Sequence, residues 1–214
     1  MNDIAIFGAG GFGREVACMI KRINKLMPTW NFIGFFDDNQ KLWGKENEYG
    51  KVLGGIEALN AWPEPLNLAI GIGSNKVVSS VIANLYNSNL KYPNLIDPAV
   101  TILDENNFIL GKGNIFAANC IISIAVKVGD FNTFNHGTVL GHDSVVGSFN
   151  SFMPNVNISG GVTIGNRNFF GVKSSVLQYL KIGDDTTIGG NAFVIRSTKN
   201  GFLYMGNPAK RMEL

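Results

Sequence analysis

Residues 137–165 read GTVLGHDSVVGSFNSFMPNVNISGGVTIG, with an apolar residue at every sixth position. The six-residue step continues in both directions without a miss. Its apolar positions are Leu110, Phe116, Ile122, Val128, Phe134, Leu140, Val146, Phe152, Ile158, Ile164, Phe170, Val176, Ile182, Ile188 and Val194. Such a hexapeptide repeat predicts a parallel β-helix, in which each coil buries its apolar face only by stacking on its neighbours.

The period also predicts the geometry of one coil. Side chains two apart on a strand share a face, so the residue two before each apolar position should point inward as well. These positions hold small or compact residues, such as Cys120, Thr138, Ser144, Val162, Ser174, Thr186 and Ala192. Three strands and three corners close a triangular coil of about eighteen residues, so the run to about Thr198 holds about five coils. Glycine often follows the apolar position, and we expect it there because it enters corner conformations without a Cβ penalty.

The N-terminal part carries a different pattern. Residues 4–7 form a short apolar strand, and GAGGFG at 8–13 satisfies G-x-G-x-x-G directly after it. A helix follows, and then a buried strand at 32–36 that ends in Asp37 and Asp38. Glycines allow close backbone approach, the helix N-terminus faces phosphate, and an acid after the second strand can bind a ribose or a base. This βαβ unit predicts nucleotide binding; the alternative is a glycine turn needed only for helix–sheet packing.

The rest of this half is shorter than a full dinucleotide-binding domain. We expect residues 40–65 to be irregular, with a short helical pattern around Ile56 to Leu59. A third strand at 66–70 leads into a second glycine motif, and a helix spans about 76–86. A short fourth strand is expected at 92–96. The second mononucleotide half used by NAD enzymes is missing, which favours a nucleotide-linked substrate over NAD.

Length and composition fit a Rossmann-like domain over residues 1–97 and a β-helix with a C-terminal tail over 98–214. The chain is 45% hydrophobic and 16% charged, and its net charge of +2 predicts neither a nucleic-acid nor a membrane partner. No apolar run approaches a membrane span, and the N-terminus lacks a signal-peptide pattern. The two cysteines have no metal-ligand spacing, so we expect no metal site and a reducing, cytoplasmic location.

Both histidines, His136 and His142, stand second after an inward residue, at a corner that points outward. Gly160 follows His142 by one coil and should lie directly above it. An imidazole is a usable base near neutral pH, Asp143 can orient it, and a free glycine N–H can stabilise an oxyanion. Base and oxyanion donor together suit acyl transfer; the alternative for either histidine is a solvated or interface corner residue.

Five motifs carry a resemblance: GAGGFG at 8–13, FDD at 36–38, IGIGSN at 70–75, GHDSVVG at 141–147 and GNPAK at 206–210. With them the chain resembles the bacterial sugar O-/N-acyltransferase family, which includes nucleotide-amino-sugar N-acetyltransferases and sialic acid O-acetyltransferases. The resemblance covers nearly the whole chain. It implies that the β-helix is left-handed, that acetyl-CoA is the co-substrate with no metal, and that a homotrimer forms its sites between the prisms of adjacent subunits.

The resemblance also implies roles for single residues. His142 is the general base that takes the proton from the sugar amine, Asp143 tunes it, and Gly160 supplies an amide near the thioester oxygen. Contacts to the nucleotide sugar are implied for Gly10, Gly11, Phe12, Asp37, Asp38, Gly73 and Asn75, and contacts to CoA for His136, Ser151, Val172 and Gly190. Two positions depart from the family: Phe12 and Ser151 stand where relatives often carry histidine.

These observations predict acetyl transfer from acetyl-CoA to the amine of a nucleotide-linked amino sugar, for surface glycan synthesis. One alternative is an O-acetyltransferase that acts on a sugar hydroxyl. Another is a non-catalytic trimeric subunit that binds a nucleotide. An NAD-dependent oxidoreductase is disfavoured, because the β-helix would then have no role.

Overall fold

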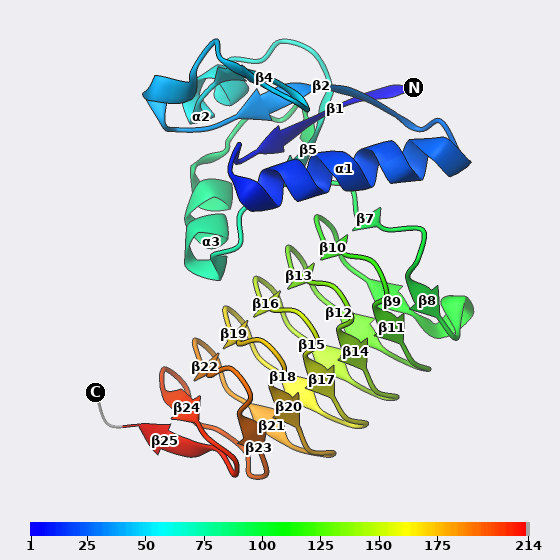
Figure 1. Ribbon diagram of the computed structural model, residues 1–214, viewed down its shortest axis with the longest axis vertical. Helices are drawn as coiled ribbons and strands as arrows, with labels where there is room; N and C mark the ends of the chain where they lie inside the picture. The colour runs from blue at the N-terminus through cyan, green and yellow to red at the C-terminus, as the bar shows by residue number, and fades with distance from the viewer. Residues whose placement is uncertain (213–214) are drawn as a thin grey trace. The chain divides into compact units, whose positions relative to one another are not determined.

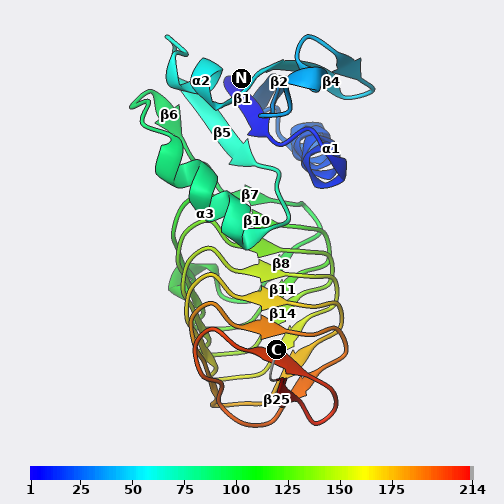
Figure 2. The ribbon, with the colours of Figure 1, turned by 90° about the vertical axis from the view of Figure 1, so that its left-hand side faces the viewer.

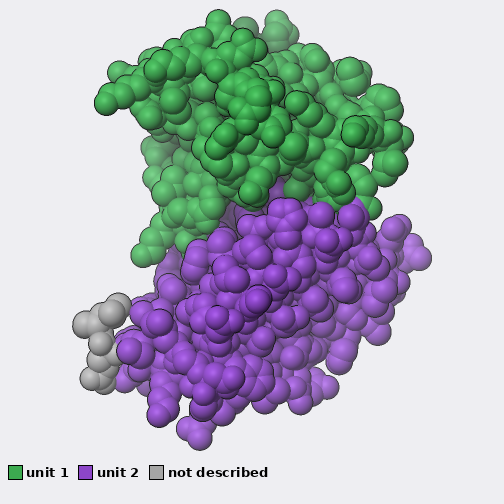
Figure 3. Space-filling model, viewed as in Figure 1, with its two compact units in different colours: residues 1–98 green, residues 99–214 purple. Residues whose placement is uncertain are grey.

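The computed structural model describes residues 1–212 and falls into two units, Met1–Pro98 and Ala99–Leu214 (Figures 1 and 3). The first unit is built on β1 (Asn2–Phe7), which forms because four consecutive apolar residues are buried on both faces of a parallel sheet. β1 pairs in parallel with β2 (Trp30–Phe36) on one side and with β5 (Leu66–Ile70) on the other. The chain therefore winds first to one side of β1 and then to the other.

The complete sheet of this unit has the order β3-β4-β2-β1-β5-β6. Its outer strands are β3 (Glu46–Asn47), β4 (Gly50–Gly54) and β6 (Leu90–Lys91). The helices are α1 (Gly11–Leu26), α2 (Ile56–Asn60) and α3 (Asn75–Asn84), with a short 3₁₀ turn at Gln40–Leu42. α1 is amphipathic and buries Val16, Ala17, Met19 and Ile20, which recur at helical spacing.

The short helical pattern predicted around Ile56 to Leu59 is confirmed as α2, but the rest of residues 40–65 is not irregular as predicted. β4 joins the sheet parallel to β2, and β3 turns back on β4 as an antiparallel hairpin (Figure 1). The strand is hard to find in the sequence because two apolar residues between glycines show no period. The expected strand at 92–96 is also displaced: β6 precedes it, and β7 spans only Leu95–Ile96.

From β8 to β23 the second unit is a stack of two-residue strands that pair in parallel from one coil to the next (Figure 2), and β24 and β25 close it as an antiparallel pair of three-residue strands. Val139 lies opposite Asn157, which confirms the eighteen-residue coil. The strands are β8 (Thr101–Ile102), β9 (Ile109–Leu110), β10 (Ile115–Phe116), β11 (Ile121–Ile122), β12 (Lys127–Val128), β13 (Thr133–Phe134), β14 (Val139–Leu140), β15 (Val145–Val146), β16 (Ser151–Phe152), β17 (Asn157–Ile158), β18 (Thr163–Ile164), β19 (Phe169–Phe170), β20 (Ser175–Val176), β21 (Lys181–Ile182), β22 (Thr187–Ile188), β23 (Phe193–Val194), β24 (Leu203–Met205) and β25 (Lys210–Met212).

The prism has three faces. One contains β23-β20-β17-β14-β11-β8, one β21-β18-β15-β12-β9, and one runs from β25 and β24 through β22, β19, β16 and β13 to β10. The first coil begins at β8, earlier than the repeat indicates, because a 3₁₀ turn at Glu105–Asn107 interrupts the six-residue step. Asp104 caps this turn by accepting a hydrogen bond from the Asn107 amide.

The predicted core of the prism is confirmed. Every inward apolar position from Phe116 to Val194 is buried, and so are the small residues two positions earlier. The rings of Phe116, Phe134, Phe152 and Phe170 stack face to face, with successive centroids 4.4, 4.7 and 4.6 Å apart. Stacking of identical rings at the coil spacing fixes the register of one coil on the next.

Beside this column lies a column of buried asparagines, Asn114, Asn132, Asn150 and Asn168. Each Oδ1 accepts a hydrogen bond from the backbone amide one coil further on, at 2.7–2.9 Å. The Nδ2 of Asn132 donates to Asn114 Oδ1 and to the Gly147 carbonyl. The asparagines therefore satisfy backbone donors that would otherwise be buried without an acceptor.

The repeat glycines are needed for a different reason from the one we expected. The left-handed conformation falls two residues after them, and at most of these positions the residue is not glycine, as at Asp143 (φ 58°) and Lys173 (φ 58°). The glycines instead allow close approach of coils: a Cβ on Gly129 would lie 2.9 Å from the Gly147 carbonyl oxygen. No helix within residues 1–212 is long and apolar enough to cross a membrane.

Candidate active site

The glycine loop between β1 and α1 separates into two kinds of glycine. Gly8 has a φ of 107°, and a Cβ there would lie 2.7 Å from the Gly71 carbonyl oxygen; a Cβ on Gly13 would collide with the Gly8 carbonyl. Packing inside the protein explains both. Gly10 and Gly11, by contrast, would meet nothing within 4 Å. Space next to a glycine backbone that no protein atom fills is what the close approach of a phosphate requires.

The second glycine motif reaches the same edge of the sheet. β1 and β5 are parallel neighbours, so their carboxyl ends meet, and Gly71 packs against Gly13. Gly73 also has nothing within 4 Å of an added Cβ. Asn75 begins α3 and is largely buried. The winding reverses between β1 and β5, which is where open α/β sheets bind ligands.

Asp37 and Asp38 follow β2 as predicted, but both carboxylates already have partners. Asp37 accepts hydrogen bonds from the amides of Ala9 and Asn39, each at 2.9 Å. Asp38 Oδ1 caps α2 by accepting from the Ile56 amide at 2.9 Å. Asp37 therefore holds the glycine loop in place. Each carboxylate keeps further lone pairs for a ligand, because an ionised carboxyl group offers about four acceptor positions.

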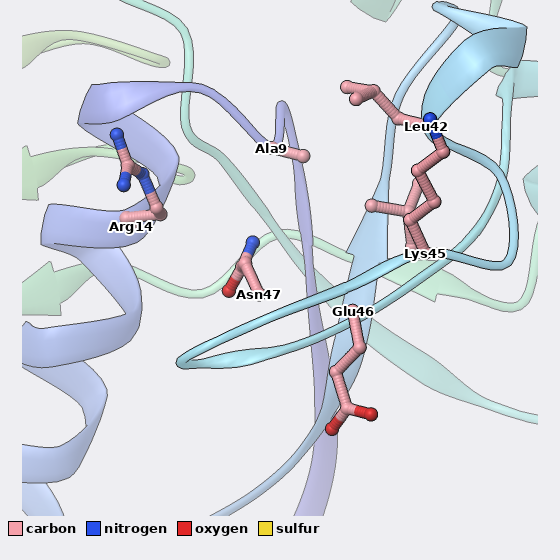
Figure 4. Close-up of a pocket in the computed structure, with 7 residues that line it drawn as sticks. Ala9, Arg14, Leu42, Lys45, Glu46 and Asn47 are labelled. Atoms are coloured by element: carbon pink, nitrogen blue, oxygen red, sulfur yellow. The ribbon is translucent and has the colours of Figure 1, made fainter.

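A pocket of about 250 Å³ opens beside this loop (Figure 4). Arg14 on α1 lies on one side, Leu42 and Lys45 lie on the other, and Ala9 of the glycine loop lies between them (Figure 4). Sequence reasoning missed both cations. Arg14 could have been found, because it directly follows the G-x-G-x-x-G motif in the first turn of α1, whereas nothing in the sequence marks Lys45. Glu46 also lines the pocket, and Arg14 pairs with Glu48 at 3.4 Å, so the two cations face acidic partners as well as the open glycine backbone.

In the second unit, His142 lies at the corner between β14 and β15. Its Nδ1 lies 2.8 Å from Asp143 Oδ2, and the two side chains are 50% and 64% exposed. If Nδ1 carries the proton and donates it to the carboxylate, the lone pair of Nε2 is free to act as a base. The two side chains are therefore within hydrogen-bond distance of each other.

Gly160 lies one coil further along the prism than His142, and the imidazole ring of His142 packs against its Cα. The Gly161 amide donates to the His142 carbonyl at 2.8 Å, which fixes the stacking of the two corners. A Cβ on Gly160 would collide with the imidazole, and its nearest atom would be Nε2. The Gly160 amide has no hydrogen-bond acceptor among residues 1–212. The predicted base and the predicted oxyanion donor are therefore adjacent.

The three edges of the prism differ in the state of their corner amides. We name each by one corner residue: the His142 edge also holds Ile124 and Gly160, and the His136 edge also holds Val172 and Gly190. The third, the Asp130 edge, holds Lys112, Asp130, Ser148, Asn166 and Asp184. Along the Asp130 edge every corner amide donates to the side chain one coil further on, at 2.6–3.0 Å.

The predicted CoA contacts are not next to His142 within one chain. His136, Val172 and Gly190 lie along the His136 edge, and the amides of Val172 and Gly190 have no acceptor among the described residues. Ser151 lies on β16, in the face opposite the His142 edge. The structure therefore brings together His142, Asp143 and Gly160 on one edge, and the CoA set on other parts of the prism.

Residues 1–212 contain no cluster of three or more His, Cys, Asp or Glu side chains that could hold a metal ion. The cysteines Cys18 and Cys120 are both free thiols.

Comparison with known proteins places this geometry in context. Residues 3–85 match the family described as the PglD N-terminal domain. Over the whole chain the fold is similar to that of the acetyltransferase domain of PglB from Neisseria gonorrhoeae FA1090, with a TM-score of 0.89 and 24% identity, covering 99% of this chain and 100% of that one. The same domain has been solved in complex with acetyl coenzyme A.

Two further structures are similar over the full length. WeeI from Acinetobacter baumannii AYE gives a TM-score of 0.87 at 24% identity, covering 99% of this chain and 100% of that one. PerB from Caulobacter crescentus, solved with CoA and GDP-perosamine, gives 0.82 at 24%, covering 100% and 98%. The predicted fold class, a Rossmann-like unit followed by a left-handed parallel β-helix, is confirmed. The predicted resemblance is confirmed in the PglD N-terminal domain and in the shared fold.

Proposed function

We propose that this chain, which carries a PglD N-terminal domain ahead of a hexapeptide β-helix, transfers an acetyl group from acetyl-CoA to the amine of a nucleotide-linked amino sugar. The observation that carries the proposal is the His142 edge, where an oriented imidazole lies against a glycine with a free amide. The similar structures include an acetyltransferase domain solved with acetyl coenzyme A and a protein solved with CoA and GDP-perosamine.

The first unit would bind the nucleotide part of the substrate. Gly10, Gly11 and Gly73 are the glycines of the two motifs that no protein atom crowds, and all three are predicted substrate contacts. The first-turn amides of α1 have no side-chain cap, so they remain available to a phosphate oxygen. Arg14 and Lys45 in the adjacent pocket would add positive charge. Phe12 is half-buried at the start of α1 and would pack at the rim of this site.

The chemical step follows from the atoms on the His142 edge. The sugar nitrogen attacks the carbonyl carbon of the thioester while His142 Nε2 takes a proton from that nitrogen. The Gly160 amide donates to the oxyanion of the tetrahedral intermediate. The carbon–sulfur bond then breaks, the CoA thiolate leaves with the proton that His142 holds, and the amide product remains. Asp143 stabilises the imidazolium through Nδ1.

A second copy of the chain would complete the site. The His142 edge and the His136 edge are different corners of one prism, so one molecule cannot present both to a single thioester. A trimer that sets the His142 edge of one subunit beside the His136 edge of the next would join His142 to the free amides of Val172 and Gly190. The free amides of Val172 and Gly190 would donate to the carbonyl groups of the pantetheine arm. The Asp130 edge could not do so, because its corner amides already donate to side chains.

The test is acetyl transfer to UDP-, dTDP- and GDP-linked amino sugars, each paired with its hydroxy-sugar counterpart, at 412 nm with a thiol reagent for released CoA. His142→Ala should lower kcat by about 10²–10⁴-fold. Lys127→Ala, an exposed change on β12, is the matched surface control. Transfer to the hydroxyl alone would identify an O-acetyltransferase, and binding without transfer would identify a non-catalytic subunit.

Subunit complementation tests the shared site. His142→Ala and Val172→Asp chains, each inactive alone, are co-expressed with different tags and purified as mixed oligomers. A site between copies predicts recovered activity, because some interfaces pair an intact His142 with an intact Val172. A monomer in light scattering, or mixed oligomers with no recovery, would contradict the arrangement.

A further inference from the structure

One exposed aromatic side chain on the His142 edge has no place in the mechanism above. Tyr179 follows the corner residue Gln178, one coil beyond Gly160, and its amide donates to the Gly160 carbonyl at 3.0 Å. Its side chain is 72% exposed. A Cβ on Gly161 would collide with the Tyr179 ring, so this ring lies directly over the Gly161 backbone. The ring therefore points back along the edge, toward the His142–Asp143 pair.

The conformation of Tyr179 is unfavourable for its side chain. Its φ of 61° is in the left-handed region, where a bulky residue is an outlier and asparagine is tolerated best. Asn119, Asn155 and Asn191 occupy equivalent corners of the prism with φ of 55–64°. Burial does not compensate Tyr179 for this conformation, because most of the side chain is in solvent.

A second glycine–aromatic pair shows what a purely structural role would look like. Phe131 lies over Gly113 in the same way, but its other face stacks on Phe149 with centroids 5.4 Å apart, and it is only 6% exposed. Tyr179 has no ring partner and no hydrogen bond from its hydroxyl within residues 1–212. One ring fills the fold, and the other leaves an aromatic face open to a ligand.

We propose that the open face of Tyr179 is a platform for the pyranose ring of the acceptor sugar and sets its position against His142. The inference rests on the proposed acetyl transfer. The base must reach the amine, so the sugar ring to which that amine is attached has to lie on the His142 edge within about one coil spacing. A pyranose presents C–H bonds on one face, and this face packs on an aromatic ring as other apolar surface does.

Tyr179 is a positioning residue in this account, since no proton or bond changes at it. Removing the ring should weaken binding of the amino sugar and leave binding of acetyl-CoA almost unchanged, because CoA is assigned to the His136 edge. Asparagine is the informative substitution: it suits the backbone at position 179 better than tyrosine, so a loss of function cannot be attributed to a loss of stability. Phenylalanine keeps the ring and removes only the hydroxyl.

The experiment measures initial rates of wild type, Tyr179→Asn and Tyr179→Phe, varying the amino-sugar nucleotide and acetyl-CoA in turn. Tyr179→Asn should raise KM for the sugar on the order of tenfold, leave KM for acetyl-CoA within twofold, and leave Tm unchanged or higher. Tyr179→Phe should behave like wild type. Gly161→Ala, which displaces the ring, should raise the sugar KM in wild type and have no further effect in the Tyr179→Asn background.

The outcomes separate this inference from the proposed function. A wild type that transfers acetyl while Tyr179→Asn keeps an unchanged sugar KM overturns the platform alone. A rise in KM for acetyl-CoA in place of the sugar also overturns it, since the ring would then contact the thioester arm. A wild type that transfers no acetyl group to any sugar overturns both.

Discussion

Gly160→Ala tests the geometry of the His142 edge with a single methyl group. A Cβ at this position would lie 2.8 Å from His142 Cδ2, whereas non-bonded carbons are at their optimum about 3.5–4.0 Å apart. The imidazole must therefore withdraw by about 1 Å. Because the ring is half-exposed and at the end of its side chain, it can rotate into solvent at little cost in folding free energy. The Gly160 amide stays in place, so the change displaces the base and keeps the oxyanion donor.

The expected result is a fall in kcat of about 100-fold, since a displacement of about 1 Å of a catalytic group costs that much. Tm should shift by less than about 2 °C, because a surface change away from the core costs within about 0.5 kcal/mol. The assay is the initial rate of CoA release at saturating substrates, with a thermal melt of the same samples.

A double-mutant cycle identifies the cause. If Gly160→Ala acts through the imidazole, it should have no further effect in a His142→Ala background. An additional 100-fold loss in that background would show that the methyl group blocks the substrate or the oxyanion site directly. Full activity in the Gly160→Ala variant would show that catalysis does not depend on the position of the His142 imidazole against Gly160.

Four further substitutions test the fold and the nucleotide site. Phe152→Ala removes the ring in the middle of the stacked column and should cost about 3–5 kcal/mol in urea unfolding, because the site is fully buried and flanked by two other rings. Asn132→Asp places a carboxylate oxygen against the Gly147 carbonyl, which now accepts from Nδ2 at 2.9 Å, and should destabilise by more than about 1–3 kcal/mol by the same measurement. Gly10→Ala should leave Tm unchanged and weaken nucleotide-sugar binding in calorimetry, whereas Gly13→Ala should lower Tm because its Cβ meets the Gly8 carbonyl. Equal Tm losses in the two glycine variants would contradict the division of the loop into open and packed positions.

The sequence predicted the prism well because the period is set by the coil itself. An inward residue recurs at every sixth position, and the structure buries each of them from Phe116 onward. The same argument could not predict where the repeat begins. A two-residue insertion at the 3₁₀ turn hides the first coil, since β8 pairs with β11 at a spacing of twenty residues and is out of phase with β9 and the later strands.

The six-residue pattern also could not predict interactions between coils. The asparagine column occupies inward positions that a hydrophobicity pattern treats as polar interruptions, yet these side chains are buried and hydrogen-bonded to the next coil. The repeat glycines were located correctly and explained wrongly, because the reason for them is the backbone of the next coil. Contacts eighteen residues away have no signature in a six-residue window.

In the candidate site, adjacency in sequence predicted the His142–Asp143 pair, and coil arithmetic predicted Gly160 above it. The state of the backbone amides along each edge was harder to predict from the sequence. Arithmetic modulo eighteen assigns His136 and His142 to different edges, but whether an edge offers free amides depends on side chains one coil away. The Asp130 edge shows this, because Asp, Ser and Asn side chains accept its corner amides.

Whether the corner amides are already hydrogen-bonded decides which edge of the repetitive β-helix can bind a ligand carbonyl or an oxyanion. An edge whose amides are already bonded has no donor for a ligand carbonyl or an oxyanion, however well placed its side chains are. Among residues 1–212, Gly160 on the His142 edge and Val172 and Gly190 on the His136 edge keep amides without an acceptor, and the two edges are separate corners of one prism. In the proposed mechanism the His142 edge supplies the base and the oxyanion donor, and the His136 edge supplies further amide donors for CoA. A catalytic unit that uses both edges therefore requires two chains. Recovery of acetyl transfer in mixed oligomers of His142→Ala and Val172→Asp chains is the measurement that tests this requirement.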